Sequence, residues 1–71
     1  MNRDKYRNAL LRMGPEELVE IVAMYENTHH TERAKKMDPD EIITLLMQFW
    51  DVRGASPVIK GRIWDRLGLA N

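Results

Sequence analysis

Two adjacent histidines come closest, of all the residues in this 71-residue chain, to the chemistry of a metal site. His29 and His30 stand between Glu26 and Glu32, and imidazole and carboxylate groups can both bind zinc. Several ligands must reach one ion, however, and adjacent histidines on an extended or turning segment point in different directions. Glu26 and His30 could share an ion only if a helix continued through both of them. We therefore expect no metal site and no cofactor.

Two pairs of adjacent acids have the composition of a general acid–base site. Glu16-Glu17 and Asp40-Glu41 each follow a proline, in the first turn of an expected helix, where the helix dipole stabilises negative charge. The chain has no cysteine, and its one serine, Ser56, stands where a helix N-cap belongs. Its glycines form no phosphate-binding loop. These observations predict no catalytic residue, and we expect that the protein is not an enzyme.

Basic side chains in the two terminal segments remain as candidates for binding a partner. The N-terminal segment surrounds an aromatic residue with cations, which suits docking on an acidic protein surface. The alternative is that this segment lies antiparallel to the acidic segment that follows it. The C-terminal cations stand on one expected helix, which would suit a DNA groove. The candidate binding residues are Arg3, Lys5, Tyr6, Arg7, Lys60, Arg62 and Arg66.

Charge is segregated along the chain although its total is zero. The 11 basic and 11 acidic side chains cancel. Residues 1–13, 31–37 and 52–71 are net basic, whereas residues 14–26 and 38–51 are net acidic. The equal number of acids opposes phosphate binding unless the fold places them on the far side from the cations. The pattern favours electrostatic steering towards a protein partner over binding to nucleic acid.

All three prolines stand where a helix would begin. Proline suits the first helical position because its missing N–H would be unpaired there in any case. The residue before each proline is an accepted N-cap. At the other end of the chain, Gly68 between two leucines predicts a glycine that ends the last helix. The three proline starts are Gly14-Pro15, Asp38-Pro39 and Ser56-Pro57.

Apolar residues recur at the three- and four-residue spacing of helices between these signals. Apolar side chains cover most of the circumference over residues 42–50, which predicts a central helix surrounded by the others. Residues 26–37 show no such apolar face, so we expect a loop there. The sequence predicts a single all-α domain over residues 1–71, a compact bundle of four short helices at about 3–13, 15–26, 39–51 and 57–67, with a loop at about 27–37.

Composition predicts a cytoplasmic protein with no membrane partner. The absence of cysteine fits a reducing compartment, and no apolar run reaches the length of a signal peptide or a membrane span. The chain begins with Met and ends after a helix stop, so we expect a complete small gene product.

These observations together favour a small, non-catalytic regulatory protein that binds a larger protein. It would inhibit or modulate a cellular machine, a profile shared by phage-type regulators of transcription or defence. The alternative is a helix-turn-helix-like DNA-binding protein that uses its C-terminal basic helix. A third reading is a structural subunit of a homo-oligomer.

Overall fold

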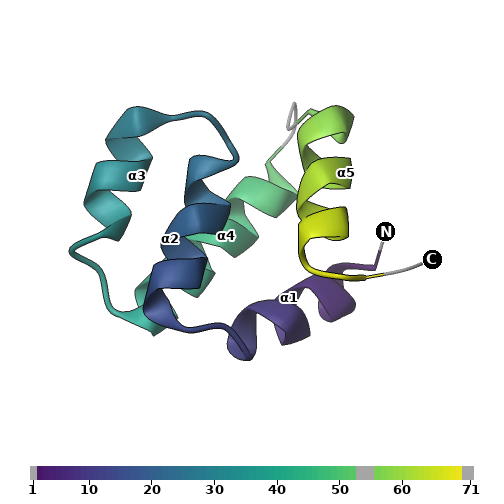
Figure 1. The fold of residues 1–71 in the computed structure, drawn as a ribbon, viewed down its shortest axis with the longest axis horizontal. Coiled ribbons are helices and arrows are strands. Elements are labelled where there is room, and N and C mark those ends of the chain that lie inside the picture. The colour runs from purple at the N-terminus through teal and green to yellow at the C-terminus, as the bar shows by residue number, and fades with distance from the viewer. Residues whose placement is uncertain (1, 53–55, 70–71) are drawn as a thin grey trace.

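The described part of the chain forms five helices, rather than the predicted four (Figure 1). The computed structural model describes residues 2–52 and 56–69, and every regular element within them is a helix. The predicted all-α class is therefore confirmed. The helices are α1 (Arg3–Leu11), α2 (Pro15–Ala23), α3 (Thr28–Ala34), α4 (Pro39–Asp51) and α5 (Pro57–Arg66).

The predicted proline starts are confirmed, and each N-cap residue has an extended backbone. Ser56 Oγ accepts a hydrogen bond from the backbone N–H of Val58 at 3.2 Å. The backbone N–H of Asp38 donates to Glu41 Oε1 at 3.3 Å, as in a capping box. These contacts satisfy backbone groups that a helix end leaves without partners.

The predicted loop at 27–37 is wrong over most of its length, because α3 occupies residues 28–34. Asn27 caps this helix by accepting a hydrogen bond from the backbone N–H of His30 at 3.1 Å. Ala34 is the only residue of α3 that is buried. A helix held by one small side chain has no apolar stripe, which is why periodicity did not reveal it.

Two of the predicted helices end earlier than the apolar pattern suggests. The helix expected over 3–13 ends at Leu11, and the one expected over 15–26 ends at Ala23. Glu26 has a φ of 61°, a left-handed conformation that no helix can contain. The apolar stripe continues to Tyr25 because the turn after α2 still packs on the core.

Gly68 ends α5 as predicted. Its φ is 71°, which favours glycine. The backbone N–H of Gly68 donates to the carbonyl of Asp65 at 3.0 Å, and that of Leu69 donates to the carbonyl of Trp64 at 3.1 Å. This pair of bonds is a Schellman motif.

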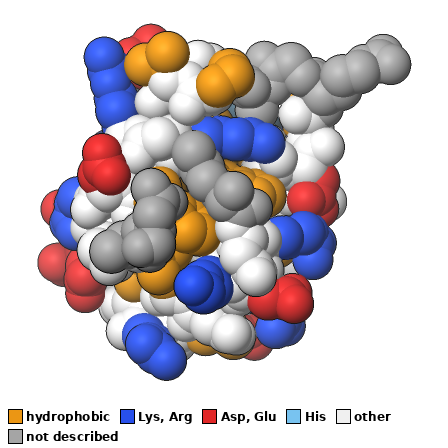
Figure 2. All heavy atoms as spheres, turned by 90° about the vertical axis from the view of Figure 1, so that its right-hand side faces the viewer, with side chains coloured by type: hydrophobic (Ala, Val, Ile, Leu, Met, Phe, Trp, Pro, Cys, Tyr) orange, Lys and Arg blue, Asp and Glu red, His pale blue; other side chains and the backbone are white. Residues whose placement is uncertain are grey.

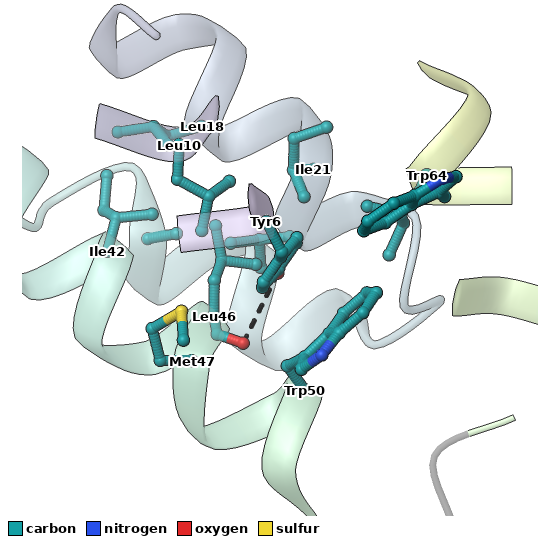
Figure 3. Close-up of a cluster of buried hydrophobic side chains, with 12 residues drawn as sticks. Tyr6, Leu10, Leu18, Ile21, Ile42, Leu46, Met47, Trp50 and Trp64 are labelled. Carbon is teal, nitrogen blue, oxygen red and sulfur yellow. Dashed lines mark hydrogen bonds between the residues drawn. The ribbon is translucent and has the colours of Figure 1, made fainter. Parts of the chain in front are cut away.

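The core lies where α1 and α2 meet the inner face of α4, with α5 closing one side (Figure 3). α1 packs on α4, whereas the acidic α2 packs on α3 and α4. The main contact of the basic N-terminal helix is therefore with α4, and not with α2 as in the alternative placement. Within the described part of the chain, eight large side chains are completely buried: Tyr6, Leu10, Leu18, Ile21, Val22, Ile42, Leu46 and Ile63.

Membrane insertion has no support in residues 2–52 and 56–69, where no helix is both long and apolar enough to cross a bilayer. The longest helix, α4, has 13 residues. A membrane-spanning helix needs about 20.

Candidate protein-binding surface

Cations from the two ends of the chain converge on the end of α4. The Arg3 guanidinium donates through Nε to Asp51 Oδ1 at 2.8 Å and through Nη2 to Asp51 Oδ2 at 2.9 Å. Lys60, from α5, holds its Nζ 5.0 Å from the centre of the Trp50 ring, within the range of a cation–π contact. The fold thus brings one residue from each predicted basic segment to the same place.

The charge environment of Asp51 reflects this convergence. The hydrogen bonds from Arg3 hold the pKa of the Asp51 carboxyl below its ordinary value, and the charge of Lys60 acts in the same direction. The same contact raises the pKa of the Arg3 guanidinium. Both partners of the pair are about half exposed, at 53% and 47% of their side-chain surface. An exposed pair of this kind contributes little to stability and remains accessible to another molecule.

Tyr6 lies beneath this surface and not on it. Its ring is completely buried and stacks on Trp50, with the ring centres 4.0 Å apart. Trp64 continues the layer at 6.3 Å from Trp50. The Tyr6 hydroxyl donates to the backbone carbonyl of Leu46 at 3.4 Å (Figure 3). A side chain with no exposed area has nothing to offer a partner, so Tyr6 positions Trp50 instead.

The other two candidates on α5 face α2 and its C-terminal turn. Arg66 Nη2 lies 2.9 Å from Glu20 Oε2, and Arg62 Nη1 lies 4.0 Å from Glu26 Oε1. Two cations that a DNA-binding helix would direct at phosphates are therefore close to acids of the same domain. Figure 2, which views the domain from the side of α5, shows acidic side chains interspersed with Lys and Arg around a hydrophobic centre. This face is mixed in charge and not uniformly basic.

Lys5 and Arg7 are exposed on α1, and neither forms an ion pair within the described part of the chain. Arg7 lines a shallow groove of about 410 Å³ between α1 and α4, together with Arg3 and Asp51. Lys5 does not line this groove. Six of the seven candidate residues therefore divide among the end of α4, the groove, the contact with α2 and the core, and Lys5 stands apart on the exposed surface of α1.

Two exposed valines lie near these helix ends, Val52 directly after α4 and Val58 in the first turn of α5. Val52 is 55% exposed and Val58 is 63% exposed, and both are among the most exposed large apolar side chains described. Val58 stands two residues before Lys60 and therefore lies on another face of α5. Arg3, Asp51, Val52 and Lys60 together form what we call the corner surface.

Sequence reasoning missed the acidic partners that organise these cations. Neither Asp51 nor Glu20 is among the residues that the sequence singled out. Each pairs with a residue more than 40 positions away along the chain. No local spacing could have revealed such pairs, although the alternating charge blocks indicated that oppositely charged segments would meet.

The histidine pair lies on α3, which is helical and not the loop we expected. The His30 ring packs against the Phe49 ring with centres 4.9 Å apart, and the His29 ring lies 5.7 Å from that of His30. Among residues 2–52 and 56–69, no three His, Asp or Glu side chains are grouped as a metal ion would need.

Comparisons with known proteins add no relative. No family model, no curated protein and no solved structure matches this chain.

Proposed function

We propose that this domain is a non-catalytic protein-binding module whose corner surface docks on a larger protein. The observation that carries the proposal is the convergence of Arg3 and Lys60 on Asp51 and Trp50. Two cations and one anion leave the corner with a net positive charge, which favours an acidic partner and speeds its approach.

Binding energy at the corner would come mainly from its exposed valine. Val52 exposes more than half of its surface, and apolar area contributes about 25 cal/mol per Å² when it leaves water. Lys60 rests its charge above Trp50, so its ammonium is held in place before a partner arrives. A module that binds in this way regulates its partner by covering a surface that another molecule needs.

The arrangement of Arg62 and Arg66 favours a protein partner over DNA. Both lie close to acids of α2 or its C-terminal turn, and a DNA phosphate would have to displace those acids or be repelled by them. Glu20 and Glu26 are not part of the corner surface, so a protein partner that binds there does not have to displace them.

The test is capture of partners from a lysate of the source cell with the tagged full chain, with and without nuclease. Two variants change the corner surface, Lys60→Glu and Val52→Asp. Arg33→Glu is the matched control, because Arg33 is an exposed cation on α3, on the opposite side of the domain from α5 (Figure 1). Circular dichroism confirms that each variant is folded.

We expect a stoichiometric protein that survives nuclease, is retained by Arg33→Glu and is lost with both corner variants. A partner retained equally by all four chains would show that the corner surface is not the interface. Recovery that disappears with nuclease, and that Arg62→Ala and Arg66→Ala also reduce, would establish DNA binding in place of this proposal.

A further inference from the structure

The groove between α1 and α4 combines an apolar floor with two unpaired charges of opposite sign. Leu11 from α1, which is 52% exposed, and Ile43 and Met47 from α4 supply its apolar part. Arg7 lines it from α1 and Asp40 from α4. Neither Arg7 nor Asp40 forms an ion pair within residues 2–52 and 56–69.

The two helices run in opposite directions along the groove, which fixes the order of these residues. Arg3, at the start of α1, pairs with Asp51, at the end of α4. One helical turn further along α1 and one turn back along α4, Arg7 comes level with Met47. After one more turn, Leu11 comes level with Ile43. Asp40 lies one turn beyond that level, so Arg7 and Asp40 stand on either side of the apolar layer formed by Leu11 and Ile43.

This order is self-complementary under a two-fold rotation. A two-fold axis in the plane of the interface, through the midpoint between Arg7 and Asp40 and at right angles to the line that joins them, exchanges the position of Arg7 with that of Asp40. A second copy placed by this axis brings Arg7 of each chain opposite Asp40 of the other. It also brings the two apolar layers into contact. A two-fold interface must match itself in this way, because the same patch is used by both copies. A uniformly acidic or uniformly basic partner would leave one of the two charges facing its own sign.

We propose that the groove between α1 and α4 binds a second copy of this chain, forming a symmetric dimer. Arg7 of each copy pairs with Asp40 of the other, and the two Leu11 side chains meet near the axis. The net charge of zero removes long-range repulsion between copies. A stable interface buries about 800 Å² on each side, roughly a sixth of the 4790 Å² surface of this domain. The groove supplies only the centre of such an area, so the dimer is weak.

The groove shares Arg3 and Asp51 with the corner surface, but Arg7 and Asp40, the two residues that the test changes, are not part of the corner surface. The test is the mass of the full chain in solution, measured by sedimentation equilibrium from about 10 µM to about 1 mM. The test variants are Arg7→Glu, Asp40→Arg and the two combined in one chain.

Two matched controls separate the groove from charge reversal in general. Lys5→Glu reverses a cation on the same helix outside the groove. Glu16→Arg reverses an acid that follows a helix-starting proline, as Asp40 does, but on α2. If Asp40→Arg fails to fold, Asp40→Asn removes the charge with less disturbance of the first turn of α4.

We expect the wild-type mass to rise from 8.4 kDa towards twice that value. Each single reversal creates two like-charge contacts and weakens association by about tenfold or more. The combined variant restores both attractive pairs and therefore restores association. An equimolar mixture of Arg7→Glu and Asp40→Arg chains associates as well, because one pair in that heterodimer is native and the other is reversed.

Three results would overturn the proposal. The first is a mass of one chain throughout the concentration range. The second is a dimer that both single reversals leave intact. The third is equal weakening by the control reversals, or no recovery in either the combined variant or the mixture.

Discussion

Burial of Tyr6 makes the stability of this domain sensitive to alkali. The ring has no exposed surface, and burial raises the pKa of the Tyr6 hydroxyl well above its ordinary value. The native state therefore keeps the proton when the unfolded chain releases it. A group with a raised native pKa stabilises the fold below the unfolded pKa, and that contribution is lost as the pH rises above it.

The size of the effect follows from the unfolded pKa of about 10. With Tyr6 neutral in the native state, the free energy of unfolding falls by RT ln(1 + 10^(pH − 10)). This loss is about 1.4 kcal/mol at pH 11 and about 2.7 kcal/mol at pH 12. A domain of this size has a net stability of about 3–5 kcal/mol, so Tyr6 alone removes a large part of it.

Replacement of Tyr6 by Phe removes this titration and keeps the stack on Trp50. The hydroxyl has two contacts, to the Leu46 carbonyl and the Tyr25 hydroxyl, both at 3.4 Å. These bonds are long, so at pH 8 the variant should lose no more than about 1 kcal/mol. At pH 11 that difference should shift by about 1.4 kcal/mol in favour of the variant.

The assay is urea unfolding of both chains at several pH values between 8 and about 11.5, followed by circular dichroism. Alkaline effects that do not involve Tyr6 are common to both chains and cancel in the difference. Tyr25→Phe is the control: its hydroxyl is only partly buried, and the variant should keep the alkaline loss due to Tyr6. If Tyr6→Phe and wild type lose stability in parallel up to pH 11, Tyr6 ionises freely and its burial is not as described.

Three further changes test other parts of the fold. Gly61→Ala should raise the free energy of unfolding by about 0.5–1 kcal/mol, because alanine favours a helix and a Cβ there meets no atom within 4 Å. A lower urea midpoint would contradict this. Gly68→Ala should lower that free energy by about 1–2 kcal/mol, since its φ of 71° strains any other residue; an unchanged midpoint would rule out the left-handed turn. Asp51→Asn should make the free energy of unfolding fall less steeply as the pH is lowered into the acid range. The lowered pKa of Asp51 means that its contribution is present above about pH 4 and is lost as the pH falls through the native value. Equal acid sensitivity in wild type and Asp51→Asn would show that the pair with Arg3 does not persist in solution.

The parts of the fold that the sequence predicted correctly depend on signals close together in the chain. A proline and its N-cap are adjacent, and the Schellman motif at Gly68 spans a few residues, so the residue types alone specify them. α3 has fewer of these local signals. It has one cap, Asn27, and one buried side chain, Ala34, and its place in the fold depends on α2 packing beside it.

The candidate site was predictable only in part, for the same physical reason. Composition identified which residues carry positive charge, and Arg3 and Lys60 do share a surface. The acids that pair with these cations are remote in sequence, so the spacing of residues gave no information about them. Tyr6 illustrates the limit clearly, because a single aromatic residue among cations suits an exposed anchor as well as a buried one. Only the position of Trp50 in the folded chain decides between the two.

The two proposed surfaces would reinforce each other, which gives a prediction that rests on both proposals. A two-fold dimer presents two corner surfaces. Once one of them is bound to a clustered partner, the other binds a neighbouring partner molecule at an effective concentration in the millimolar range or below. Arg7→Glu, which disperses the dimer, should therefore weaken binding to a partner densely immobilised on a sensor surface. The same variant should bind the free partner in solution as the wild type does, because Arg7 lies outside the corner surface. Equal loss in both formats would mean that Arg7 contacts the partner directly, and equal binding in both would mean that the dimer does not contribute to recognition.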